Sequence, residues 1–460
     1  MYDDGKKSFL GNILYSILWL GGLALLIFIV YKIGFGSVAG TFAEGEAPGE
    51  NDSEQIVIAE AEDSSAGAPS QEEAGMEEIE ASDEEPEAEE PPAEEPSVPE
   101  DEDAAVINAV IANMSTEAKV AQLFFITPEQ LTGVDKATVF GDMSAASFAE
   151  RPVGGLIYSK GNLESPDQTK EMLAKADECS RQLTSLPLFI GIDEEGGSVL
   201  KLASNPAFNL EQTPSMKELS GESVEDAVYH AADQIGQYLK EYGFNVDLAP
   251  VADLVADPEN SAIGDRSFGD DAELTAKLCA DYSGGLHNNN ILSCYKHFPG
   301  HGSTMTEDSH DGPASSARTL EELRSADLVP FIDGSSGKTD FIMTGHISFK
   351  DIPESEGLPA SLSYFFNTEL LRHEIGYEGI IITDALNMKA ITSAVNSADA
   401  SVKAFQAGCD MLLTPEDFET AYQALLQKIN SGDISEDRLN ESVYRIIKAK
   451  LKLLSEPSAP

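Results

Sequence analysis

The stretch LFIGID, residues 188–193, is a short apolar run that ends in an aspartate. Segments with helical amphipathic spacing flank it, at residues 165–183 and 224–243. Seven further short apolar runs recur along the chain, at residues 122–126, 154–159, 245–250, 291–298, 340–347, 379–385 and 409–414. Eight buried strands that alternate with helices predict an α/β fold, with a parallel sheet closed into a single (β/α)8 barrel. An open doubly wound sheet is the alternative, although no glycine-rich phosphate fingerprint follows the first run.

The predicted barrel accounts for residues 104–455, and two segments of different composition precede it. Residues 9–31 carry no charge and are long enough to cross a bilayer, so we expect a transmembrane anchor helix after a short cytoplasmic N-terminus, residues 1–8. A cleaved signal peptide is the alternative, but its apolar region usually has only about 7–15 residues. Residues 37–103 are rich in Glu, Pro, Ala and Ser, and we expect a disordered acidic linker there.

Basic residues near the apolar segment indicate how it would be oriented in a membrane. Lys6 and Lys7 precede the segment, and Lys32 alone follows it before the acidic run. The positive-inside rule therefore predicts a single-pass protein of the cell membrane with an extracytoplasmic catalytic domain, which would be released if the segment were cleaved.

The formal net charge of -52 makes nucleic acid an unfavourable partner. The sequence gives no indication of the oligomeric state. The cysteines form no CxxC pair, and buried free thiols are favoured over a disulfide or a metal site at Cys179, Cys279, Cys294 and Cys409.

Polar residues gather at the C-terminal ends of the predicted strands. The positions concerned are Asp193, Asp247, Lys296-His297, His346 and Asp384. One carboxylate at such a place could merely cap the following helix. In a barrel, however, these strand ends form one rim, and the active site is built there. Five positions on the same rim therefore favour a catalytic site.

Five motifs around these positions resemble glycoside hydrolase family 3, and in particular its β-N-acetylglucosaminidase (NagZ-like) branch. The motifs are DEEGG (193–197), RSFG (266–269), KHFPGHG (296–302), DSH (308–310) and TDALNM (383–388). KHFPGHG followed closely by DSH is the most specific of them. The resemblance covers roughly residues 105–450 and implies a barrel that hydrolyses glycosidic bonds with retention of configuration.

The resemblance implies three catalytic residues. Asp384 matches the nucleophile, which would form a covalent glycosyl-enzyme. His310 matches the general acid/base of this branch, and Asp308 matches its partner in a dyad. A histidine, with an ordinary pKa of about 6.5, can donate a proton at neutral pH without the burial that a glutamic acid would need.

The same resemblance assigns sugar binding to five residues, Asp193, Lys201, Arg266, Lys296 and His297. Lys201 stands where the family usually carries an arginine, and a lysine keeps the charge but loses bidentate hydrogen bonding. Ser198 and Gly345 also depart from the usual family residues. We expect His301 to have a structural role, and we expect no metal ion and no cofactor.

These observations predict an exo-acting β-N-acetylglucosaminidase that removes terminal non-reducing N-acetylglucosamine from peptidoglycan fragments outside the cytoplasmic membrane. A β-glucosidase or β-xylosidase of the same family and a phosphorolytic variant are alternatives. A metallohydrolase that uses His297, His301, His310 and Asp308 as ligands is a third. A membrane-anchored module that binds cell-wall sugar without turnover is a fourth.

Overall fold

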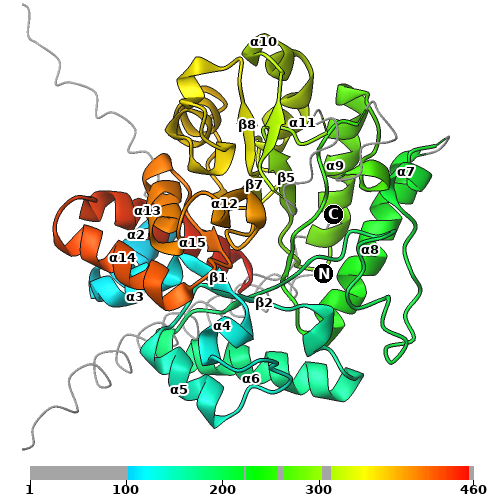
Figure 1. Cartoon of the computed structure of the whole chain (residues 1–460). Coiled ribbons are helices and arrows are strands. Elements are labelled where there is room, and N and C mark those ends of the chain that lie inside the picture. The colour runs from blue at the N-terminus through cyan, green and yellow to red at the C-terminus, as the bar shows by residue number, and fades with distance from the viewer. Residues whose placement is uncertain (1–101, 222–223, 256–262, 303–311, 455–460) are drawn as a thin grey trace, which may run out of the picture. The chain divides into compact units, whose positions relative to one another are not determined.

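The computed structural model describes residues 102–221, 224–255, 263–302 and 312–454 (Figure 1). The chain divides into two units, residues 1–91 and 92–460, and all described residues belong to the second. The predicted anchor at 9–31 and nearly all of the predicted linker at 37–103 lie outside the described residues. Among the helices within these ranges, none combines the length and the apolar character that crossing a bilayer requires.

Within the described ranges, eight parallel strands occupy the centre of the fold. They are β1 (Phe124–Ile126), β2 (Gly155–Ile157), β3 (Phe189–Ile192), β4 (Val246–Asp247), β5 (Cys294–Phe298), β7 (Phe341–Thr344), β9 (Ile380–Thr383) and β10 (Leu412–Leu413). One sheet has the order β10-β1-β2-β3-β4, and a second has the order β5-β7-β9. Each of the eight apolar runs predicted from the sequence contains one of these strands, so the predicted α/β fold with parallel strands is confirmed.

Isolated parallel bridges connect the two sheets on both sides. Val246 of β4 bridges Leu292, which precedes β5, and Ile382 of β9 bridges Met411, which precedes β10. Backbone hydrogen bonds accompany these bridges, because Asp247 N donates to Leu292 O at 2.9 Å and Met411 N donates to Ile381 O at 3.1 Å. Each strand is thereby connected to the next in the order, from β4 to β5 and from β9 back to β10.

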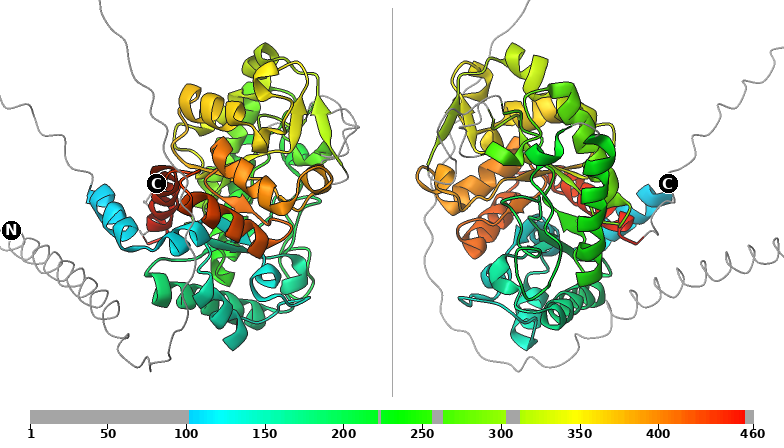
Figure 2. Two further views of the ribbon diagram at one scale, coloured as in Figure 1. Left: turned by 60° about the vertical axis from the view of Figure 1, so that its left-hand side comes forward. Right: turned by 90° about the vertical axis from the view of Figure 1, so that its right-hand side faces the viewer.

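Helices lie around the outside of the strands, as α6, α8 and α9 do in Figures 1 and 2. The α-helices are α2 (Glu102–Asn113), α3 (Thr116–Gln122), α4 (Pro128–Thr132), α5 (Asp142–Glu150), α6 (Pro166–Thr184), α7 (Met216–Leu219), α8 (Val224–Tyr242), α9 (Ala272–His287), α10 (Leu320–Glu322), α11 (Val329–Gly334), α12 (Lys389–Thr392), α13 (Ser397–Ala407), α14 (Phe418–Asn430) and α15 (Glu436–Lys452). Shorter 3-10 or π-helical elements are η1 (Lys160–Asn162), η2 (Gly264–Arg266), η3 (Leu323–Asp327), η4 (Pro353–Ser355), η5 (Ala360–Leu362) and η6 (Phe365–Glu374). A separate two-stranded sheet pairs β6 (Ala314–Ser316) with β8 (Ile347–Phe349).

Local sequence explains where α6 begins and ends. The Ser165 hydroxyl accepts a hydrogen bond from Gln168 N, and the Gln168 side chain accepts one from Ser165 N, which is a capping box. Pro166 occupies the first turn, where its missing N–H costs nothing. Ser185 then ends the helix in the left-handed region, at φ 61°.

The aromatic ring of Phe125 in β1 explains two glycines in the neighbouring strands. A Cβ atom at Gly155 of β2 would lie 2.6 Å from Phe125 Cδ2, and one at Gly191 of β3 would lie 2.5 Å from Phe125 Cζ. No side chain fits at such distances, so both positions require glycine. The apolar runs at 154–159 and 188–193 therefore carry a glycine because the ring of β1 fills the space beside them.

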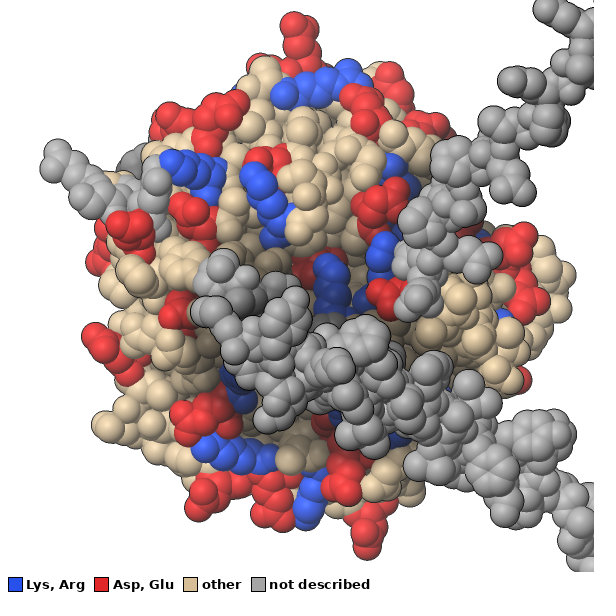
Figure 3. All heavy atoms as spheres, turned by 180° about the vertical axis from the view of Figure 1, so that it is seen from behind, with Lys and Arg blue, Asp and Glu red and all other residues tan. Residues whose placement is uncertain are grey.

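Exposed ion pairs contribute little to this fold. Acidic and basic side chains are interspersed over the described part of the face in Figure 3. Pairs such as Lys170 with Glu241, and Arg324 with Glu374, lie on the surface at 2.8 Å and 2.7 Å. Pairs of this kind are worth about 0–1 kcal/mol each. The buried interior therefore carries most of the stability.

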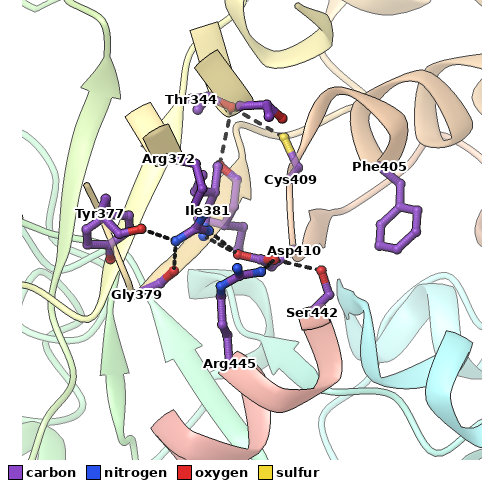
Figure 4. Close-up of polar contacts among 12 residues, drawn as sticks. Thr344, Arg372, Tyr377, Gly379, Ile381, Phe405, Cys409, Asp410, Ser442 and Arg445 are labelled. Carbon is purple, nitrogen blue, oxygen red and sulfur yellow. Dashed lines mark hydrogen bonds and ion pairs between the residues drawn. The ribbon is translucent and has the colours of Figure 1, made fainter. Parts of the chain in front are cut away.

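A buried aspartate next to the start of β10 fastens α15 to the strands (Figure 4). Asp410 accepts hydrogen bonds from Arg372 Nη2 at 2.7 Å, from Ser442 Oγ at 2.6 Å and from Arg445 Nη1 at 3.1 Å. Burial alone would raise the pKa of Asp410, but the neighbouring arginines lower the pKa by more than burial raises it. The pKa of Asp410 is therefore below its ordinary value. Because Asp410 precedes its strand, this cluster lies at the strand ends opposite to those that carry Asp193 and Asp384.

Lys450 of α15 is a buried amine near the same ends of the strands. Its Nζ donates to Gln122 Oε1 at 2.8 Å and lies 5.1 Å from the centre of the Phe189 ring. Burial lowers the pKa of Lys450 to about 7. In the unfolded chain the pKa of a lysine is about 10.4, so between these values the unfolded state binds more protons and the free energy of unfolding rises with pH.

Between pH 7 and pH 9, Lys450 contributes up to about 1.4 kcal/mol per pH unit to the rise in the free energy of unfolding. Lys450→Met is expected to remove this contribution, so the free energy of unfolding should rise less steeply with pH in the variant. Chemical denaturation at both pH values measures the effect. Lys448→Met, on the exposed side of the same helix, is the matched control and should keep the slope of the wild type. Equal slopes for wild type and Lys450→Met would contradict the prediction.

Candidate active site

Polar side chains from β5, from η2 and from the segment that follows β3 form one ion network. Lys296 Nζ lies 2.8 Å from Asp193 Oδ1 and 2.6 Å from Glu195 Oε1. Arg266 forms a bidentate contact with the same glutamate through one edge of its guanidinium, with Nε 2.7 Å from Oε2 and Nη2 2.8 Å from Oε1. Glu195 therefore contacts two of the predicted sugar-binding residues, Lys296 and Arg266, and Lys296 connects it to a third, Asp193. Glu195 lies within the DEEGG motif but is not among the site residues predicted from the sequence.

Burial and charge determine which groups of this network face outward. The side chains of Lys296 and Glu195 are each 3% exposed, whereas that of Asp193 is 31% exposed. Burial would raise the pKa of Glu195, but Arg266 and Lys296 lower it well below its ordinary value. Burial would lower the pKa of Lys296, but Asp193 and Glu195 raise it above its ordinary value. The network thus holds a fixed cation behind an accessible carboxylate, an arrangement suited to hydrogen bonding with sugar hydroxyl groups.

Lys201 is held near this network through its backbone. Glu194 accepts hydrogen bonds from the backbone N of Lys201 at 2.6 Å, of Leu202 at 2.9 Å and of Ala203 at 2.8 Å, and from Tyr238 Oη at 3.0 Å. Glu194 therefore orders the turn after DEEGG. The Lys201 side chain is half-buried, and in the described part of the chain its ammonium forms no hydrogen bond or ion pair.

His297 and His301 share one buried carboxylate, that of Asp253. His297 Nδ1 lies 2.8 Å from Asp253 Oδ2, while the backbone N atoms of His297 and His301 donate to Oδ1 at 3.1 Å and 2.7 Å. Burial would raise the pKa of Asp253, but the neighbouring histidines lower it. The His301 ring is buried, and burial together with His297 lowers its pKa. The contact of His301 with Asp253 is made by its backbone N, so the structural role of its side chain stays a prediction.

Asp384 directly follows β9 and is 8% exposed. Its backbone N donates to Thr344 O at 2.9 Å, and its Oδ1 accepts from Ala385 N at 2.7 Å. His346, which follows β7, lies with Nε2 3.0 Å from Ala385 O and with Nδ1 2.7 Å from Ser361 Oγ. Ala385 is therefore held at its backbone N by the Asp384 side chain and at its backbone O by His346. The sequence places His346 at a predicted strand end but does not predict its contact with Ala385 O.

The structure locates some of the predicted site residues and leaves others outside its described ranges. Asp193, Arg266 and Lys296 lie in one network, and His297 and Asp384 lie at the C-terminal ends of β5 and β9. Asp308 and His310 belong to residues 303–311, outside the described residues.

Side chains that commonly ligate metals do not cluster into a candidate metal site in the part of the chain that the structure describes. No group of three or more His, Cys, Asp or Glu residues that could hold a metal ion occurs there. All four cysteines are free thiols. Cys279, Cys294 and Cys409 are buried, as predicted, whereas Cys179 is only half-buried.

Comparison with known protein families identifies the family of this chain. The model of the glycosyl hydrolase family 3 N-terminal domain matches residues 115–449, which cover nearly all of the described residues. The chain belongs to glycosyl hydrolase family 3. The family predicted from DEEGG, RSFG, KHFPGHG, DSH and TDALNM is thereby confirmed.

Named relatives of this family 3 chain are hexosaminidases. Beta-hexosaminidase A of Pseudoalteromonas piscicida is 32% identical over 321 residues, which are 65% of this chain and 54% of that protein. A beta-hexosaminidase of Idiomarina loihiensis is 33% identical over 311 residues, covering 66% of this chain and 87% of that protein. The chain thus spans about half the length of the first relative and most of the second.

A solved structure resembles this family 3 chain over most of its described residues. The glycoside hydrolase family 3 beta-N-acetylglucosaminidase from Paenibacillus sp. str. FPU-7 has a TM-score of 0.69 and 33% identity, covering 75% of this chain and 64% of that one.

Proposed function

We propose that this family 3 chain is a retaining exo-β-N-acetylglucosaminidase. The observation that carries the proposal is the placement of Asp384 after β9, at the same strand ends as the Asp193–Lys296–Glu195–Arg266 network. One group can attack an anomeric carbon, and the others can hold the hydroxyl groups of the same sugar. The names of the similar proteins, beta-hexosaminidase and beta-N-acetylglucosaminidase, support N-acetylglucosamine as that sugar.

In the proposed reaction the Asp384 carboxylate attacks the anomeric carbon while the bond to the leaving oxygen breaks. His310 gives its proton to that oxygen, and Asp308 holds the imidazole in the required tautomer. In the second step His310 removes a proton from water, which attacks the anomeric carbon and releases Asp384. Two displacements at one carbon restore the original configuration, so the first product is the β-anomer.

The substrate we propose is a peptidoglycan fragment with a terminal non-reducing N-acetylglucosamine, outside the cytoplasmic membrane. The uncharged segment 9–31 and the lysines before it support an anchored, extracytoplasmic enzyme. We also propose that the eight parallel strands form a (β/α)8 barrel, and the bridges from β4 to β5 and from β9 to β10 support this closure.

Two nitrophenyl glycosides and defined muropeptides test this function with the full-length protein. Release of nitrophenol from nitrophenyl β-N-acetylglucosaminide, at a kcat/KM at least about tenfold above that for the β-glucoside, is the expected result, because a pocket that hydrogen-bonds the acetamido group rejects a sugar without it. Defined muropeptides should lose one N-acetylhexosamine by mass. Equal or faster cleavage of the glucoside would contradict the proposal, and binding of muropeptides without release of sugar would indicate a wall-binding module. Formation of a sugar phosphate when phosphate is added would indicate phosphorolysis.

A further inference from the structure

We propose that Asp253 is a positioning residue that fixes the tautomer of His297 and directs its Nε2 toward the sugar. Asp253 follows β4 in the sequence, 44 positions before His297, and it is 1% exposed. The inference rests on the proposed function in one respect, since it takes His297 as a group that contacts the substrate.

The contacts of Asp253 determine where the proton of His297 resides. Oδ2 of the carboxylate lies 2.8 Å from His297 Nδ1, and Oδ1 accepts hydrogen bonds from the backbone N atoms of His297 and His301. An ionised carboxylate only accepts hydrogen bonds, so Nδ1 carries a proton. In the neutral ring Nε2 is therefore an unprotonated acceptor.

Of the two nitrogen atoms in the His297 ring, Nε2 is the one available to bind a ligand. The His297 side chain is 7% exposed, and within the described ranges Nε2 forms no hydrogen bond. Gly345 borders the ring at its base, because a Cβ added there would lie 3.1 Å from His297 Cβ. Asp253 is itself held in place, because its backbone O accepts from Ser267 Oγ at 2.6 Å. A hydroxyl group of the sugar can thus donate to Nε2 without any rearrangement of the ring.

Asp253→Asn tests this assignment because it keeps the shape of the side chain. The amide oxygen can still accept from the two backbone N–H groups, but the amide nitrogen then faces His297 Nδ1 as a donor. The proton of the ring must move to Nε2, which turns the proposed acceptor into a donor. Mutation of the carboxylate that orients a metal-ligating histidine typically costs about 10–100-fold in affinity or activity, and we use this range for a histidine that binds sugar. We expect a loss of that size in kcat/KM, mostly as a higher KM.

The decisive measurement is the tautomer itself, by ¹⁵N NMR of the full-length chain labelled at histidine, with His297→Gln used to assign the signal. A protonated Nδ1 in the wild type and a protonated Nε2 in Asp253→Asn are expected. A wild type with its proton on Nε2, or the same tautomer in both proteins, overturns the inference. This spectrum needs no substrate, so it is decided separately from the proposed function, which fails if the wild type releases no N-acetylglucosamine.

Kinetics add a second criterion. If Asp253 acts through His297, the double variant Asp253→Asn/His297→Gln should lose no more kcat/KM than His297→Gln alone. Additive losses would show an independent structural role and overturn the inference. Asp340→Asn is the matched control, because Asp340 also pairs with a histidine and a backbone N–H, His287 at 2.7 Å and Ser293 N at 3.1 Å, but precedes its strand. This control should change stability and leave KM as in the wild type.

Discussion

Asp384→Asn is expected to lower kcat for nitrophenyl β-N-acetylglucosaminide by about 10⁴-fold or more, the order of magnitude observed when a catalytic nucleophile is removed. An amide cannot form the covalent glycosyl-enzyme, whereas its shape preserves the hydrogen bond that Ala385 N donates to the side chain at 2.7 Å. Sugar binding should therefore persist. Steady-state kinetics with the wild type and calorimetric binding of N-acetylglucosamine to the variant measure both parts.

A second variant separates loss of the nucleophile from loss of the fold. Asp384→Gly leaves space on the α-face of the sugar, and azide can attack the anomeric carbon there while nitrophenolate leaves. The expected product is the α-glycosyl azide, which Asp384→Gly should form and the wild type should not. Formation of a covalent adduct on any other side chain of Asp384→Asn, or retention of a tenth of the activity, would rule out this assignment.

Glu195→Gln is expected to lower the free energy of unfolding by about 3–5 kcal/mol, the cost of breaking a buried ion pair by removing the charge of one partner. Glu195 is the shared partner of Lys296 and Arg266, so the variant removes the one negative charge that both of these cations contact. The same change should weaken sugar binding. Lys296 Nζ lies 2.6 Å from Glu195 Oε1, and without this ion pair Lys296 would be less firmly positioned behind the site.

The pH dependence of this effect follows from the lowered pKa of Glu195. Its ionisation stabilises the folded state fully above the unfolded pKa of about 4.3, and the contribution is lost as the pH falls further toward the folded pKa. The difference between wild type and variant should therefore stay constant from pH 7 to about pH 5 and narrow below pH 4. Urea denaturation measures it, with Glu378→Gln on the exposed surface as control. A loss no larger than that of the control would contradict the structural role of Glu195.

The strands and the rim could be predicted because both depend on local patterns. A buried strand of a parallel sheet needs only a short apolar run, and all eight runs contain strands in the structure. The polar residue after such a run, as at Asp193 and Asp384, lies at the C-terminal strand end whatever the rest of the chain does.

The partners of those residues could not be predicted, because the contacts join distant parts of the chain. Glu195 meets Arg266 across 71 positions, and Asp253 meets His297 across 44. Glu195 lies within the DEEGG motif, but the local sequence of neither carboxylate indicates its partner. His346 likewise stood at a predicted strand end, but its contact with Ala385 depends on the packing of β7 against β9.

By itself, the sequence determined the α/β class, the positions of the strands, the family and the group of side chains at one set of strand ends. Only the tertiary structure decided which of these side chains are paired, with Glu195 between Lys296 and Arg266 and with Asp253 beneath His297. The reason is that hydrophobic periodicity is a property of neighbouring residues, whereas the charge state and direction of a buried side chain depend on groups that folding brings within about 3 Å of it.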